Sequence, residues 1–178
     1  MISRLLAVSV VALTLVSGAL AARTAGTAQA LPAQGVLTPG VSLGGLHIGD
    51  TMAQVVQRWG HNYRICPKNQ CKGAGSVWYY VYGRGEPLGA AVRFNKNSRV
   101  MAVFTLGSPA GWRTAEGLLI GQAVDDATRI YGQNLVWSVC IGYGAMSMRN
   151  SKAVTSIYTT GESIYGFAIT APGTPVCQ

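Results

Sequence analysis

The sequence predicts an α+β fold built from two tandem repeats, each a short helical segment followed by an antiparallel β-meander. The first observation is a sixteen-residue stretch that occurs twice, from Gly45 to Gly60 and from Gly117 to Gly132. Both copies open with Gly-Leu-x-Ile-Gly and continue with apolar residues at helical spacing. The second observation is that apolar and polar residues alternate after each copy, as in antiparallel strands with one covered face. We expect the helices to cover that face of the sheet.

The first amphipathic run predicts a helix over Thr51–Trp59. Asp50 and Thr51 suit the N-cap, and Gly60 suits the left-handed conformation that ends a helix. The apolar residues recur at i, i+3, i+4 and i+7 and indicate one buried face, made of Met52, Val55, Val56 and Trp59. The matching helix of the second copy has a weaker cap, because Ala123 stands where the first copy has Thr51.

Seven strands are expected from period-two alternation and from the turns between them. They are Val77–Tyr82, Ala90–Asn95, Val100–Leu106, Leu135–Tyr143, Ala145–Arg149, Val154–Thr159 and Ile164–Thr170. The predicted domain organisation is a leader over residues 1–30, an irregular lead-in over 31–40, a first repeat over 41–108 and a second repeat over 109–178.

The repeated motif resembles a known family. The first copy carries it through Gly45, Leu46, Ile48, Gly49, Thr51, Val55 and Gly60. It is similar to the tandem-repeat fold of the beta-lactamase inhibitory proteins and of the small outer-membrane lipoprotein subunit of the barrel-assembly machinery. The resemblance implies a non-enzymatic protein, and for the inhibitors a sheet surface and loops rich in aromatic residues that face an enzyme's active site. A secreted actinobacterial-type protein on this fold fits the sequence as well as either named group.

The first thirty residues have the features of a secretory signal peptide. Arg4 provides the positive start, an apolar run extends from Leu5 to Ala22, and Ala28-Gln29-Ala30 fits the small-x-small cleavage pattern. We expect cleavage after Ala30, with a second possible site after Ala22, and hence a secreted or extracytoplasmic protein. The alternative is a retained membrane anchor, since the run has about the minimum length that spans a bilayer. No cysteine lies near the cleavage region, so the sequence does not support a lipid anchor.

All four cysteines follow the leader, and an even number in an exported chain indicates disulfides. Three pairings are possible. We favour Cys66–Cys71 with Cys140–Cys177, because each bond then stays within one repeat, and each would stabilise the fold by about 2–4 kcal/mol. A metal site is the alternative, but Cys-x4-Cys without a second pair or a neighbouring histidine is poor zinc spacing.

The chain is moderately basic. Its formal net charge is +8, and removal of Arg4 and Arg23 with the leader leaves +6. Anionic wall polymers, lipid surfaces or an acidic protein face are therefore conceivable partners. The basic residues are scattered rather than clustered in a run, so no nucleic-acid partner is expected.

The sequence contains no convincing catalytic or cofactor motif. Gly40-Val41-Ser42-Leu43-Gly44 matches Gly-x-Ser-x-Gly, but Pro39 precedes it and the two histidines, His47 and His61, are close by in sequence. The acidic residues fall at helix starts and turns, without an acid/base pair. We therefore expect no catalytic residues, no cofactor, no metal and no enzymatic activity.

Aromatic residues give the best functional lead. Trp78, Tyr80 and Tyr82 share one face of an expected strand, and aromatic and arginine side chains are typical anchors of binding surfaces. The candidate surface combines these three residues with Arg93 and Arg149. The expectation is a secreted non-catalytic binding protein that acts through a sheet face and hairpin loops, such as an inhibitor of an extracellular enzyme. The alternative is a cell-envelope structural or assembly factor that associates with anionic wall or lipid.

Overall fold

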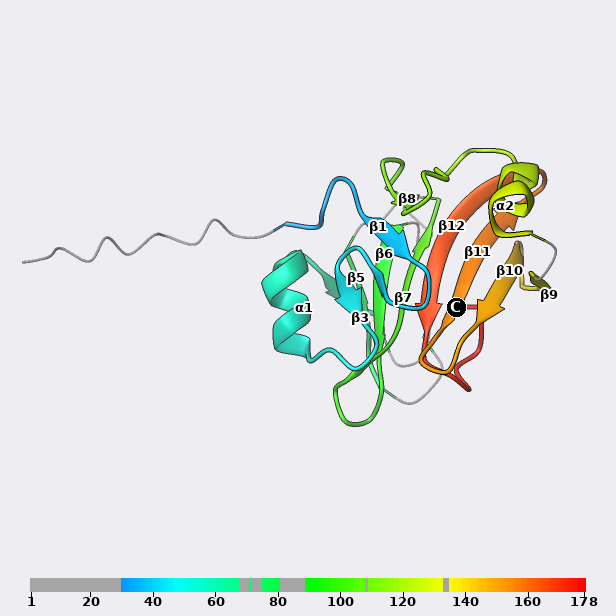
Figure 1. The fold of residues 1–178 in the computed structure, drawn as a ribbon. Coiled ribbons are helices and arrows are strands. Elements are labelled where there is room, and N and C mark those ends of the chain that lie inside the picture. Colours follow the sequence, from blue (N-terminus) through cyan, green and yellow to red (C-terminus); the bar gives the residue numbers. More distant parts are fainter. Residues whose placement is uncertain (1–29, 68–70, 72–74, 81–88, 108, 133–134) are drawn as a thin grey trace, which may run out of the picture.

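The computed structural model describes residues 30–67, 71, 75–80, 89–107, 109–132 and 135–178. Eight strands form the larger sheet, in the order β4-β5-β6-β7-β12-β11-β10-β9 (Figure 1). They are β4 (Arg64–Ile65), β5 (Val77–Tyr79), β6 (Gly89–Phe94), β7 (Val100–Leu106), β9 (Val136–Val139), β10 (Gly144–Arg149), β11 (Val154–Thr160) and β12 (Ser163–Thr170). All neighbours pair antiparallel, and β7 meets β12 in the middle, with Val103 opposite Ile169. The two edges of this sheet are therefore β4 and β9.

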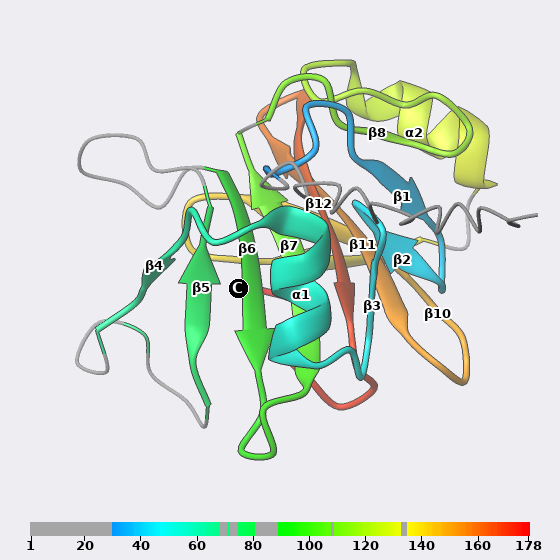
Figure 2. The same ribbon diagram turned by 90° about the vertical axis from the view of Figure 1, so that its left-hand side faces the viewer.

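Four very short strands form a second sheet, in the order β3-β2-β1-β8. They are β1 (Val36–Thr38), β2 (Ser42–Leu43), β3 (Leu46–His47) and β8 (Arg113–Thr114). β1 pairs parallel with β8, with Leu37 opposite Thr114, so the pairing joins distant parts of the chain. Figure 2 shows the short strands β1–β3 lying across one face of the larger sheet, beside the helix α1 (Met52–Trp59).

The predicted fold class is wrong. The protein is mostly β, with 42% of residues in strands, 13% helical, two short helices in the described residues and two sheets. It is not a pair of helix-then-meander repeats with helices over a sheet face. The physical reason is that strands of two or three residues are too short to show period-two alternation in the sequence, so the second sheet was not predicted. The segment 31–40, expected to be an irregular lead-in, supplies β1, and its Leu37 is fully buried.

The two helices lie close to where their apolar spacing placed them. The α1 helix is capped by Thr51, whose side-chain oxygen accepts from the Gln54 N–H at 3.1 Å, while Gln54 Oε1 accepts from the Thr51 N–H at 2.8 Å. The second helix, α2 (Val124–Tyr131), begins after Ala123, which offers no side-chain cap. Neither is long and apolar enough to cross a membrane, and nor is any other helix in the described part of the chain.

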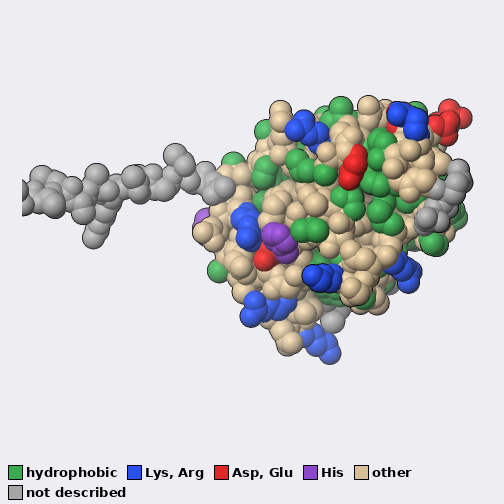
Figure 3. All heavy atoms as spheres, in the orientation of Figure 1, with side chains coloured by type: hydrophobic (Ala, Val, Ile, Leu, Met, Phe, Trp, Pro, Cys, Tyr) green, Lys and Arg blue, Asp and Glu red, His purple; other side chains and the backbone are tan. Residues whose placement is uncertain are grey.

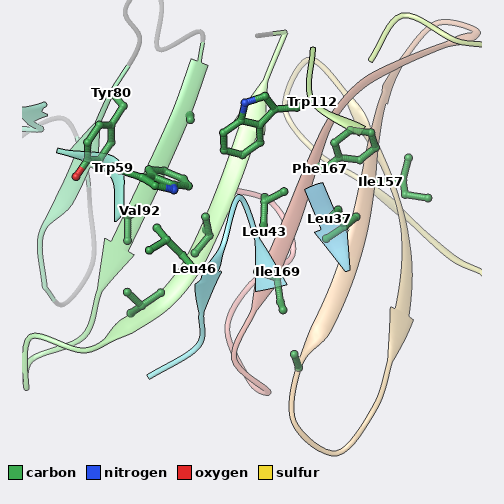
Figure 4. Packing of buried hydrophobic residues seen from close by; sticks show 14 of the residues in the cluster. Leu37, Leu43, Leu46, Trp59, Tyr80, Val92, Trp112, Ile157, Phe167 and Ile169 are labelled. Atoms are coloured by element: carbon green, nitrogen blue, oxygen red, sulfur yellow. The ribbon is translucent and has the colours of Figure 1, made fainter. Parts of the chain in front are cut away.

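The main core lies between the two sheets. Figure 4 shows Leu37, Leu43 and Leu46 of the small sheet facing side chains of the larger one, among them Phe167 and Ile169. Two buried indoles hold this layer together: Trp59 of α1 meets Trp112 edge to face, with ring centroids 5.4 Å apart. The small sheet thus does much of the covering that the sequence pattern had assigned to the helices.

A second cluster occupies the opposite face of the larger sheet. It includes Tyr79, Phe104 and Tyr158, and the C-terminal tail packs on it through Val176 and Cys177. Apart from its edge strands β4 and β9, the larger sheet thus has apolar residues buried on both faces.

The favoured disulfide pairing is the one that the structure contains. Cys66 is bonded to Cys71, and Cys140 to Cys177. The described residues include no free cysteine. The first bond lies next to edge strand β4 and the second next to edge strand β9, so each edge of the larger sheet has a covalent clamp.

Candidate functional site

The hairpin formed by β9 and β10 exposes an unusual amount of apolar surface. Val139 is 84% exposed and Ile141 is fully exposed, while Trp137 is 54% and Val136 is 56% exposed. Of the large hydrophobic side chains that are exposed in the described residues, most lie between Leu119 and Ile141. Figure 3 shows hydrophobic side chains gathered on the side of the molecule where α2 and β10 lie. Contiguous exposed apolar patches of this kind often mark interaction sites for proteins or ligands.

Local sequence explains why this hairpin forms. The Cys140 N–H donates to the Tyr143 oxygen at 2.9 Å and closes the turn, and Gly142 takes a left-handed φ of 83° that favours glycine. The disulfide to Cys177 anchors the base of the turn to the C-terminal tail. The exposed residues are therefore held on a fixed scaffold.

A groove of about 340 Å³ lies beside this hairpin. Its lining comes from the β9–β10 hairpin and from the turn between β11 and β12, namely Trp137, Val139, Cys140, Gly142, Tyr143, Gly144, Thr159, Thr160 and Gly161. Gly144 lets the Trp137 ring lie close to the sheet, because a Cβ there would sit 2.6 Å from the indole and 2.8 Å from Thr159 Oγ1. The groove thus combines one large aromatic wall with glycine and threonine, which suits an apolar group flanked by hydrogen-bonding groups.

Two tyrosines support the hairpin: Tyr158, which is fully buried, and Tyr143, which is partly buried and also lines the groove. The Tyr158 hydroxyl donates to the Val176 oxygen at 2.6 Å. The Tyr143 hydroxyl donates to the Gln178 oxygen at 3.0 Å and accepts from the Gln178 N–H at 2.8 Å. Burial raises the pKa of both phenols, so both keep their protons and their hydrogen bonds at physiological pH. The tail is therefore fixed against Tyr143 and Tyr158 by hydrogen bonds as well as by the disulfide.

The aromatic residues selected from the sequence lie in the core instead of on a surface. Trp78 is 6% and Tyr80 is 8% exposed. The Trp78 ring stacks on Tyr63 with centroids 4.0 Å apart, and Tyr80 meets Trp59 edge to face at 5.1 Å. The face of β5 that carries Trp78 is the one turned towards α1 and the small sheet.

The structure does not gather the remaining predicted binding residues around them. Arg93 is half-buried on the opposite face of the sheet, since its cross-strand partners are Val77 and Ala102. Arg149 is exposed at the end of β10, and Tyr82 lies outside the described residues. The four described residues of this set, Trp78, Tyr80, Arg93 and Arg149, therefore do not form the single surface that was predicted.

The Gly-x-Ser-x-Gly segment forms part of the small sheet. Ser42 of β2 lies opposite His47 of β3. His47 Nδ1 is 3.6 Å from Asp50 Oδ2, which is too long for a hydrogen bond, and that oxygen already accepts from the His47 N–H and from Arg58, each at 2.9 Å. Asp50 therefore holds the turn before α1, and it does not orient an imidazole towards Ser42. Within the described residues, no group of three or more potential ligands could hold a metal ion.

Trp137 was not selected as a site residue from the sequence, because the pattern around it predicts burial. The run Val-Trp-Ser-Val-Cys-Ile over residues 136–141 is uncharged and has apolar residues at both odd and even positions. Such a run predicts a strand covered on both faces. In the structure it is an edge strand that is exposed on both.

No protein-family model, curated protein or solved structure matches this chain. The resemblance to the inhibitory proteins therefore stays a prediction, and the functional argument depends on the site itself.

Proposed function

We propose that this protein is a secreted, non-catalytic binding protein that holds an extracellular or envelope protein through the β9–β10 hairpin and the adjoining groove. An inhibitor of an extracellular enzyme is one member of this class. The observation that carries the proposal is the exposed Trp137, which lines the groove on a hairpin that the Cys140–Cys177 disulfide anchors.

Physical reasoning supports a binding role for this hairpin. Tryptophan is enriched at binding hot spots, where it contributes a large apolar area with few rotatable bonds. Val139 and Ile141 extend the apolar area next to it, and exposing such side chains to water opposes solubility unless a partner covers them. Two disulfides are compatible with an oxidising, extracytoplasmic location.

The test is capture of a partner from secreted and envelope fractions on the immobilised, oxidised protein. Trp137→Ala and Thr160→Arg should each weaken capture by about 30-fold or more, the first by removing the aromatic wall and the second by filling the groove. Ile65→Ala is the matched control, because Ile65 is 60% exposed on β4 at the other edge of the same sheet. Ile65→Ala should leave capture unchanged.

Salt separates the proposal from the alternative role at the envelope. A protein partner held by apolar contacts should remain bound at high salt. Retention by wall polymer or lipid alone, released by salt and unaffected by Trp137→Ala, would contradict the proposal and support an electrostatic envelope factor.

A further inference from the structure

We propose that β9 also pairs with β9 of a second copy of the chain, so that two copies form a dimer with one continuous sheet of sixteen strands, eight from each. This inference goes beyond the proposed function, since it concerns the open backbone edge of β9 and a second copy of the chain, while the side chains of Trp137 and Val139 also line the groove. It rests on the backbone of β9, on its side chains and on the distribution of charge.

The backbone of β9 is ready to pair. Because Cys140 and Tyr143 are a hydrogen-bonded pair, the next hydrogen-bonded pair along the hairpin is Ser138 with Ala145. The N–H and C=O groups of the residues between, Trp137 and Val139, therefore point away from β10 towards the open edge. In the described part of the chain, no strand lies on that side of β9. Cys177 Sγ is 3.8 Å from the Val139 oxygen, but a disulfide sulfur carries no proton to donate.

The edge lacks the usual protection against pairing. Natural edge strands are shielded by lysine or other charges, by proline or by being very short. β4, at the other edge, has two residues, of which Arg64 is charged, and Pro67 follows shortly after it. β9 is longer and has neither a charge nor a proline.

The sequence of β9 is complementary to itself. A two-fold axis at Ser138 places Ser138 of one copy opposite Ser138 of the other. Trp137 of each copy then lies opposite Val139 of the other copy. This register makes Trp137 and Val139 a hydrogen-bonded pair between copies through their outward-pointing backbone groups. Aromatic residues opposite β-branched ones, and serine opposite serine, are favourable cross-strand pairs. The pairing thus brings no charge and no buried polar group against an apolar one.

Charge also favours this edge for a second copy. Residues 41–108 carry eight Lys and Arg against two Asp and Glu, whereas residues 109–178 carry four of each. Pairing through β9 brings the neutral parts together. Arg64 of each copy then lies at the far ends of the joined sheet, well beyond a Debye length of about 8 Å. Pairing through β4 would instead bring the basic parts into contact.

Sedimentation velocity of the exported, oxidised protein over a wide range of concentration tests the dimer. The wild-type protein should dimerise as concentration rises. Val139→Pro removes the outward N–H of each copy without removing a bond to β10, and Val139→Lys adds the charge that edges normally carry. Each should raise the dissociation constant about tenfold or more, while Ile65→Lys on β4 should not change it.

Several outcomes would overturn the dimer. A wild-type protein that stays monomeric at all concentrations would do so, and so would a dimer that survives both changes at Val139 in variants whose circular dichroism is native. A monomer that loses its captured protein partner on Val139→Pro but keeps it on Val139→Ala, which retains the N–H, would assign this edge to a foreign strand. Thr160→Arg should leave the dimer intact, because Thr160 belongs to β11, so failure of the dimer and failure of the proposed function give different results.

Discussion

Trp59→Ala is expected to lower the free energy of unfolding by about 4 kcal/mol from lost packing and the cavity left behind. Trp59 is fully buried and joins three parts of the molecule. Its ring contacts Tyr80 and Trp112, and its Nε1–H donates to the Gly44 oxygen at 2.8 Å. Gly44 has a φ of 57°, and a Cβ there would lie 2.6 Å from Trp112 and 2.9 Å from Trp59, so the small sheet is fitted closely around both rings.

Urea denaturation of oxidised protein measures this loss, with two variants as controls. Trp59→Phe keeps an aromatic ring but leaves the buried Gly44 oxygen without its donor, which should cost about 1–3 kcal/mol. Trp137→Ala makes the same chemical change at a half-exposed site and should cost less than about 1 kcal/mol. Equal losses for Trp59→Ala and Trp137→Ala would contradict the assignment of one indole to the core and the other to the surface.

Removal of the Cys140–Cys177 disulfide by paired serine substitutions should cost about 4 kcal/mol, against about 2 kcal/mol for Cys66–Cys71, on the chain-entropy relation. The first bond spans 37 residues and the second 5, so the first restricts the unfolded chain more. The hydrogen bonds of Val176 to Tyr158 and of Gln178 to Tyr143 should also weaken, because the tail that carries them is released.

Denaturation midpoints of the two double-serine variants and of the wild type measure the difference, with amide hydrogen exchange of residues 171–178 as a second readout. We expect fast exchange of the tail only when Cys140 and Cys177 are replaced. A larger loss of stability from the Cys66–Cys71 pair would show that strain or structure in the unfolded chain outweighs loop length.

Local features of the sequence predicted local structure well. Both helices follow from their apolar spacing and closing glycine, and α1 also from its N-cap, while β7, at Val100–Leu106, follows from alternation and the turn before it. The disulfide pairing follows from the even number of cysteines and from keeping each bond within one half of the chain. The helices and β7 depend on residues close together in the chain.

Features that depend on distant pairing were not predictable in this way. β1 is positioned by its pairing with β8, which lies far along the chain. The three residues of β1 are too few to show the alternation of a strand. The face of β5 was equally undetermined, since Trp78 packs on one side and Tyr79 on the other, and both are buried. The exposure of Trp137 depends on β9 being the last strand of the sheet, which only the topology reveals.

The most direct test of the binding surface is photo-cross-linking from the β9–β10 hairpin beside the groove. Ile141, which is fully exposed and does not line the groove, would be replaced by p-benzoylphenylalanine. Ser151 is the control, because it is exposed at the opposite end of β10. The binding account predicts one dominant cross-linked extracellular or envelope protein from position 141, also when the irradiation is done at high salt, and none from position 151. Equal labelling from both positions, or labelling from neither, would contradict it.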